Sequence, residues 1–147
     1  MAAFDIVIHG GRIVDGTGNP WFHGDVAIKD GKIASIGKIS PEAGVRAISA
    51  KGLVATPGYI DMHTHSDQPL VADGNAESKV RQGVTLDIIG ESQTVAPLEG
   101  AILEEYRAEH RQRHGIEADW KTFTGYFDKL LRGGISINVA SGVSPQQ

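Results

Sequence analysis

The fold is decided by the stretch Pro57-Gly58-Tyr59-Ile60-Asp61-Met62-His63-Thr64-His65-Ser66-Asp67. Pro-Gly marks the start of a strand, and apolar, β-favouring residues then lead into a His-x-His pair. Side chains of an extended strand alternate between its two faces, so His63 and His65 are predicted to point the same way. Neutral imidazole is the commonest metal ligand among side chains. The stretch therefore predicts the floor of a metal site.

The residues around this pair separate it from an ordinary half-exposed strand, which is the usual meaning of a lone His-x-His. Asp67 adds a carboxylate two residues past the pair. Gly83-Val84-Thr85 opens a second strand about twenty residues further on, which is the spacing of a β/α repeat. The context therefore favours a metal site over a chance pair.

This stretch resembles the first barrel strand of the amidohydrolase superfamily, which reads Pro-Gly, two apolar residues, then Asp-x-His-x-His. Asp67, with Gln82-Gly83-Val84-Thr85 and Val95-Ala96-Pro97 downstream, makes the sequence most similar to the N-acyl-D-amino-acid deacylase (D-aminoacylase) branch. The resemblance runs over nearly the whole chain. It implies a metal-dependent hydrolase of non-peptide C–N amide bonds, with an N-acylated amino acid as substrate.

Residues 1–56 have the pattern of short, mostly antiparallel strands. An alternating run over 4–14 is broken at Gly10-Gly11, which predicts two strands joined by a turn. Asp30-Gly31 between two further alternating runs predicts a hairpin with a type I′ turn. The resemblance implies that residues 1–56 are the N-terminal part of a small β-sandwich.

From residue 57 onward strands alternate with helices. We expect helices over 75–83, 98–114 and 119–131, the last capped by Asp119, and strands over 84–90 and 135–141. The resemblance implies an α/β fold in which residues 57–147 are the first three or so β/α units of an incomplete TIM-like (β/α)8 barrel. A full barrel takes roughly 250 residues. We therefore expect the front piece of a longer amidohydrolase or a truncated gene product, inactive alone in either case.

The resemblance assigns His63 and His65 as metal ligands, with zinc as the expected divalent ion. D-Aminoacylases place a cysteine ligand just after the second barrel strand, but this sequence has no cysteine. Glu91 is the candidate for that ligand, because carboxylates bind zinc readily. Counted from Gly90, however, the family's cysteine falls at Ser92, and Glu91 could instead bond a substrate or a helix amide.

Three further residues are predicted to contact the substrate or to support the ligands: Asp67, Asp61 and Ser92. Asp61 shares the histidines' face one residue pair deeper in the strand, so we expect it to orient a ligand or to pair within the barrel. The resemblance also implies a bridging lysine or carboxylate, two more histidines and an aspartate general base. These groups are expected beyond residue 147, so no catalytic base is assigned here.

A second histidine pair, His110 and His114, stands at i and i+4 on the predicted helix over 98–114. The metalloprotease motif requires Glu directly after the first histidine, and Arg111 is there instead. Arg111 and Arg113 would also repel a cation. We therefore predict that this pair lies on a solvated face and binds no metal.

Composition excludes several classes of protein. Apolar residues make up 40% and charged residues 22% of the 147, which is typical of a globular domain. The net charge of −4 argues against nucleic acid as a partner, since that requires a basic patch. No apolar run reaches the roughly 18 residues of a membrane span. Without a visible secretory signal or cysteine, the expected compartment is the cytoplasm.

Two alternatives stay open at this stage. The first is a cyclic-amide hydrolase such as a dihydroorotase or hydantoinase, because the loop that would separate these enzymes is expected beyond residue 147. The second is a non-catalytic fragment that binds metal or takes part in assembly. An open barrel would expose strand edges, which favours self-association.

Overall fold

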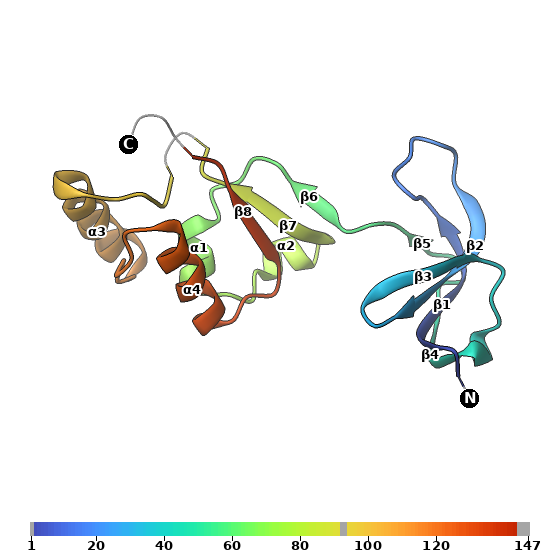
Figure 1. Cartoon of the computed structure of the whole chain (residues 1–147). Coiled ribbons are helices and arrows are strands. Elements are labelled where there is room, and N and C mark those ends of the chain that lie inside the picture. Colours follow the sequence, from blue (N-terminus) through green and yellow to red (C-terminus); the bar gives the residue numbers. More distant parts are fainter. Residues whose placement is uncertain (1, 92–93, 144–147) are drawn as a thin grey trace. The chain divides into compact units, whose positions relative to one another are not determined.

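The chain forms two compact units, Met1–Pro57 and Gly58–Gln147. The computed structural model, drawn in Figure 1, describes residues 2–91 and 94–143. The elements in chain order are β1 (Phe4–Ile13), β2 (Phe22–Lys29), β3 (Lys32–Gly37), the 3-10 helix η1 (Pro41–Ala43), β4 (Gly44–Ser49), β5 (Val54–Ala55), β6 (Tyr59–Asp61), α1 (Asp67–Ala72), α2 (Glu77–Val80), β7 (Val84–Ile89), α3 (Gly100–His114), α4 (Phe123–Gly133) and β8 (Asn138–Ser141). Among the described residues, no helix has the length and apolarity needed to cross a membrane.

The first unit is built on one sheet with the order β3-β2-β1-β4, and β5 also pairs with β1. The hairpin predicted at Asp30-Gly31 is confirmed, because β2 and β3 are antiparallel and the two turn residues have φ angles of 51° and 70°. The expectation of mostly antiparallel strands is wrong for β4 and β5, which both run parallel to β1. The chain passes through η1 to the far side of β1, and β4 therefore enters in the same direction as β1.

The glycine pair in β1 produces a bulge rather than the predicted turn. β1 is continuous, and its register with β2 shifts between Ile8 and Gly11. A Cβ atom at Gly11 would lie 2.9 Å from the Cβ of Ala50, so the glycine allows close packing at this point. The bulge bends β1 without ending it, which is the usual effect of an extra residue in one strand.

Asp25 of β2 holds this bulge in place. Its carboxylate accepts hydrogen bonds from the backbone N–H groups of Ile39 and Gly10, each at 2.8 Å. The bond from Ile39, followed by the bond from Gly10, holds the pKa of Asp25 below its ordinary value of 3.8. The ionised form of Asp25 therefore stabilises the first unit.

We predict that Asp25→Asn reduces the loss of stability in acid. A carboxylate with a lowered pKa in the folded state stabilises that state above its ordinary pKa, and this contribution disappears as the pH falls through the lowered value. Melting temperatures measured from about pH 7 down to about pH 2.5 should fall less for Asp25→Asn than for the parent. Asp128→Asn, at an exposed aspartate of α4, is the control. Equal falls in parent and Asp25→Asn would contradict the prediction.

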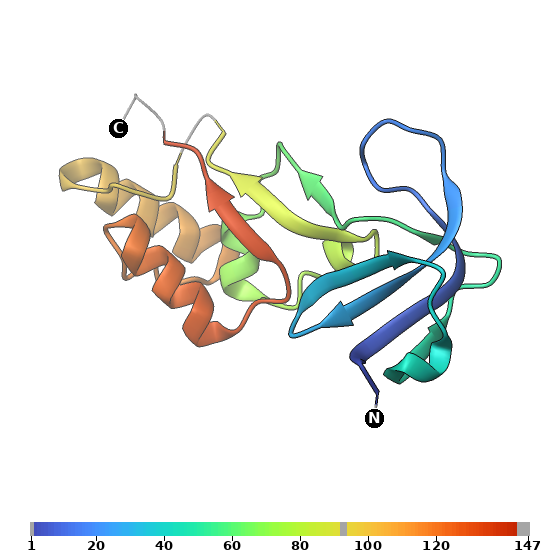
Figure 2. The same ribbon diagram turned by 45° about the vertical axis from the view of Figure 1, so that its right-hand side comes forward.

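The second unit contains a three-stranded sheet with the order β6-β7-β8, in which both pairings are parallel. Helices α1 and α2 connect β6 to β7, and α3 and α4 connect β7 to β8. Figures 1 and 2 show α1, α3 and α4 gathered on one side of this sheet. The predicted alternation of strands and helices in an α/β arrangement is therefore confirmed.

The core of this unit lies between the sheet and these helices. Its buried side chains are Leu70, Ile89, Val95, Ala96, Leu98, Leu103, Tyr106, Ile116, Ala118, Trp120, Tyr126, Leu130 and Ile137. The Trp120 ring meets the Tyr126 ring edge-on at 5.4 Å, and its indole N–H donates to the Val95 carbonyl at 3.0 Å. The hydroxyl of Tyr126 donates to the Asp67 carbonyl at 2.8 Å, which ties α4 to the start of α1.

The helices differ from the prediction at their ends. The cap of α4 is Thr122, whose hydroxyl accepts from the Gly125 N–H at 3.1 Å. Asp119, the predicted cap, instead pairs with Lys129 at 3.2 Å. Only Glu77–Val80 of the predicted helix over 75–83 is helical, and the sequence pattern missed α1. A threonine three residues past an aspartate offers an equal cap, so the pattern alone did not place the helix start.

The prediction that His110 lies on a solvated face is wrong. Its side chain is buried on α3, with its ring 3.9 Å from that of Tyr106, and burial lowers its pKa. Leu103, Tyr106 and His110 follow each other at three and four residues, so they share the buried face of the helix. His114 is exposed, as predicted.

We predict that Leu130→Ala destabilises the second unit by about 2–5 kcal/mol, because it opens a cavity in the core. Leu130 is 2% exposed, whereas the adjacent Leu131 is 71% exposed. Leu131→Ala is therefore a matched control, with an expected change within about 0.5 kcal/mol. Urea unfolding of both variants measures the difference, and equal destabilisation would contradict the assigned core face of α4.

Candidate metal centre

The two histidines follow strand β6 and are not part of it. β6 ends at Asp61, so the period-2 alternation that predicted a common direction does not extend to His63 and His65. Their rings nevertheless meet edge-on with centroids 5.7 Å apart. The side chains are 65% and 67% exposed, so both are open to solvent on one side.

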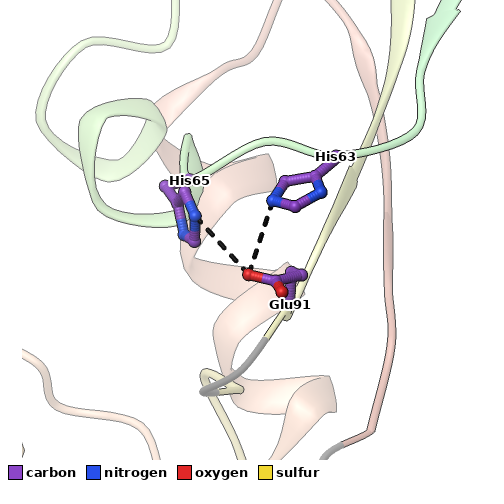
Figure 3. Close-up of side chains that lie close together, drawn as sticks. All are labelled: His63, His65 and Glu91. Atoms are coloured by element: carbon purple, nitrogen blue, oxygen red, sulfur yellow. Dashed lines mark ion pairs between the residues drawn. The ribbon is translucent and has the colours of Figure 1, made fainter.

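Glu91 reaches the same place from the end of β7. Since β6 and β7 are parallel neighbours, their carboxyl ends lie at the same edge of the sheet. Gly90, with a φ of 86°, turns the chain there, and a Cβ atom at this position would lie 2.7 Å from the hydroxyl of Ser141. One Glu91 carboxylate oxygen then lies 3.4 Å from His63 Nε2 and 3.6 Å from His65 Nε2 (Figure 3).

The separations of Glu91 from the two histidine nitrogens fit a zinc ion. The ligand atoms of His63, His65 and Glu91 all lie within 4.8 Å of one another. With Zn–N and Zn–O distances of about 2.0–2.2 Å, two ligands of a tetrahedral ion lie roughly 3.4 Å apart. The observed 3.4 Å and 3.6 Å match that separation and exceed an ordinary hydrogen bond. Three protein ligands also leave one position open, as in catalytic zinc sites.

Asp61 lies beside this cluster, and each of its carboxylate oxygens already accepts a hydrogen bond. One oxygen accepts from the backbone N–H of His63 at 3.2 Å, and the other lies 2.5 Å from Lys79 Nζ. The hydrogen bond from Lys79, and then that from His63, lowers the pKa of Asp61. Asp61 therefore contacts the backbone of a candidate ligand and also forms an ion pair with Lys79, and its role in orienting a ligand stays a prediction.

The sequence did not predict a group of interacting polar residues next to the cluster, on α2, β7 and the loop after β6. Lys79 of α2 also donates to Thr64 Oγ1 at 2.8 Å, and its Nζ lies 3.9 Å from a carboxylate oxygen of Asp87. Asp87 is fully buried on β7 and accepts from the hydroxyl of Ser66 at 2.5 Å. The available signal was a single carboxylate within the apolar run Val84–Ile89, because a buried charge requires a partner.

The remaining predicted site residues are Asp67 and Ser92. Asp67 begins α1, where its carboxylate accepts from Gln68 Nε2 at 3.3 Å. After burial, the charge of Asp67 is the next cause that raises the pKa of both Tyr106 and Tyr126. Asp67 is therefore close to the aromatic core and is not one of the three clustered donors. Ser92 lies outside the described residues.

No protein-family model matches the chain. Among curated proteins, the D-aminoacylase of Alcaligenes xylosoxydans xylosoxydans is 31% identical over 145 residues, which cover 93% of this chain and 28% of the relative. The N-acyl-D-aspartate deacylase of the same organism is 40% identical over 98 residues, which cover 66% of this chain and 20% of the relative. The chain thus spans less than a third of the length of these relatives.

Solved structures give the same result. A D-aminoacylase that defines a subset of the amidohydrolases matches with a TM-score of 0.77 at 29% identity, covering 96% of this chain and 30% of that one. The N-acyl-D-glutamate deacylase of Bordetella bronchiseptica, in complex with zinc and a phosphonate inhibitor, matches with a TM-score of 0.73 at 31% identity, covering 96% and 29%. The homologues of this chain are therefore amidohydrolases. Within that class they are the D-aminoacylases and the N-acyl-D-aspartate and N-acyl-D-glutamate deacylases, which confirms the resemblance seen in the sequence motifs.

We predict that the chain binds Zn²⁺ through the three clustered donors. The parent should retain zinc after purification without chelator, and His63→Ala/His65→Ala should lose it, as measured by elemental analysis. Glu91→Gln should weaken the affinity by more than about tenfold, since loss of even an outer partner of a ligand costs roughly 10–100-fold. His114→Ala, at an exposed histidine of α3, is the control. Equal zinc content in the parent and the double variant would contradict the prediction.

Proposed function

We propose that the chain is part of a metal-dependent amidohydrolase that removes the acyl group from N-acyl-D-amino acids. The observation that carries this proposal is the convergence of His63, His65 and Glu91 at the carboxyl ends of two neighbouring parallel strands. In α/β barrels, this end of the strands carries the active site. The substrate class is supported by the relatives, which are deacylases of N-acyl-D-amino acids.

We also propose that residues 57–147 begin a TIM-like barrel and that residues 1–56 are part of a β-sandwich. Support for the barrel comes from three parallel strands in sequential order with helices between them. Support for the sandwich comes from an apolar groove on the sheet of the first unit, which a second sheet would cover. The apolar side chains that line it are Ile8, Ile13, Val14, Val26, Ile28, Ile33, Ile36, Ala55 and Pro57.

Zinc is the ion that we propose for this site. Two imidazoles and one carboxylate form a donor set that suits zinc. The N-acyl-D-glutamate deacylase of Bordetella bronchiseptica has been solved with zinc, and D-aminoacylase has a binuclear metal centre. A D-aminoacylase mutant is also known in complex with CuCl₂, so zinc is not the only ion found in these relatives.

The chain's own residues would each have one task in this reaction. His63 and His65 must be neutral with the proton on Nδ1 if Nε2 is the ligand atom. Glu91 adds a negative charge that offsets part of the charge of a cation. A bound divalent ion supplies Lewis-acid chemistry, because it activates water and polarises an acyl carbonyl. The proton would be transferred by an aspartate outside these 147 residues, in the role of general base.

We predict that the complete product of the reading frame containing this chain hydrolyses N-acetyl-D-amino acids when zinc is supplied. Release of the free D-amino acid measures the activity, with N-acetyl-D-glutamate, N-acetyl-D-aspartate and N-acetyl-D-methionine as substrates. His63→Ala/His65→Ala should reduce kcat/KM by more than about 100-fold, because it removes two ligands where an outer partner alone contributes 10–100-fold.

The controls separate this proposal from its alternatives. The N-acetyl-L isomers test stereospecificity, and hydantoin and dihydroorotate test the cyclic-amide alternative. Hydrolysis of the cyclic amides without any deacylation would favour that alternative. Full deacylase activity in the double histidine variant would exclude the proposed site, and the 147-residue chain alone is expected to show no turnover.

A further inference from the structure

We propose that Lys79 is a positioning residue that fixes the loop carrying His63 and His65 in register with Glu91. This inference rests on the proposed function only in that the positioned side chains are the candidate ligands. Lys79 belongs to α2 and does not touch the ligands themselves. It contacts residues on both of the strand ends from which the ligands project.

The first set of contacts is with the end of β6 and the loop after it. Lys79 Nζ lies 2.5 Å from a carboxylate oxygen of Asp61 and donates to Thr64 Oγ1 at 2.8 Å. Asp61 in turn accepts from the backbone N–H of His63. One ammonium group therefore anchors the chain on both sides of His63.

The second set of contacts joins this loop to β7. Lys79 Nζ lies 3.9 Å from Asp87, which accepts from the hydroxyl of Ser66 at 2.5 Å. Thr64 and Ser66 flank His65 and are 7% and 8% exposed. The anchored side chains thus point inward, while the side chain of His65 is 67% exposed. Glu91 lies four residues past Asp87, just beyond the end of β7, so the network ties the histidine loop to the strand that leads into Glu91.

The charges of this network make the lysine necessary. Asp87 is fully buried, and the Lys79 side chain is 20% exposed. Within residues 2–91 and 94–143, both Asp61 and Asp87 have Lys79 as their only ion-pair partner. Loss of the ammonium group would leave a buried charge unpaired beside a second carboxylate. The loop and β7 would then separate, and the donors would lose their spacing.

The test compares Lys79→Met with Lys121→Met in the whole chain. Methionine retains most of the lysine stem without the charge, and Lys121 is an exposed lysine of the same unit. The first readout is amide hydrogen exchange in the metal-free protein, followed by NMR. Exchange over residues 62–66 should accelerate at least about tenfold in Lys79→Met, while amides around Leu130 in the core keep their protection. Lys121→Met should change neither region.

The second readout is the affinity for Zn²⁺, measured by competition with a chelating indicator. Lys79→Met should lower it by about 10–100-fold, the range found for outer partners of metal ligands. The variant Lys79→Met/Asp87→Asn removes the buried charge together with its partner, and it covers the case in which Lys79→Met does not fold. It should still show fast exchange over residues 62–66, because Asp61 and Thr64 have lost their donor.

Each outcome decides the proposal. Unchanged exchange over residues 62–66 in a folded variant overturns it, as does parent-like zinc affinity where the parent binds zinc. Loss of protection throughout the second unit in both variants also overturns it, because Lys79 would then act on global stability. If the parent binds no zinc, the proposed function loses its support, while the exchange result still decides the role of Lys79.

Discussion

The buried carboxylate of Asp87 imposes the constraint on which the second unit depends. A charge without access to water must be paired and hydrogen-bonded, or the folded state loses several kcal/mol. Ser66 and Lys79 provide these partners, and they come from the loop after β6 and from α2. Both partners face the same Asp87 oxygen, Oδ2, and their contacts with it draw three segments together at one edge of the sheet. The open cluster of His63, His65 and Glu91 follows the same two strands, β6 and β7.

The candidate donors are exposed, whereas the polar residues that support them are buried, and both groups meet because of the parallel topology. Parallel strands expose their carboxyl ends together, so residues that follow β6 and β7 meet without any long-range signal in the sequence. The supporting residues are polar and enclosed, since Thr64, Ser66 and Asp87 are nearly or fully buried. The candidate donors are exposed, with side-chain exposures of 65% for His63, 67% for His65 and 49% for Glu91. Exposed donors supported by buried hydrogen bonds are the arrangement that precise binding sites require.

Residue types predicted the candidate donors, but local patterns did not predict their support. His63, His65 and Glu91 could be proposed from the residues around the His-x-His pair and from the resemblance to the amidohydrolase superfamily. The reason given for the histidines, strand periodicity, was wrong because β6 ends at Asp61. The contact between Lys79 and Asp87 joins a short helix to a strand through tertiary packing, which no single-sequence period encodes. The parallel pairing of β4 was missed for the same reason, since alternation shows a strand but not its direction.

Gly90 bears on how readily a centre of this kind can change its ion. Its backbone conformation and its contact with Ser141 leave no room for a side chain, so the turn into Glu91 is fixed by packing rather than by the donor. The backbone turn is therefore determined by Gly90, and the ligand atom is determined separately by the side chain of residue 91. A single codon change at residue 91 could replace a hard oxygen with a softer sulfur or nitrogen while the backbone stays where it is. Since ligand softness and geometry select among transition metals, metal preference in such a scaffold can diverge faster than its architecture.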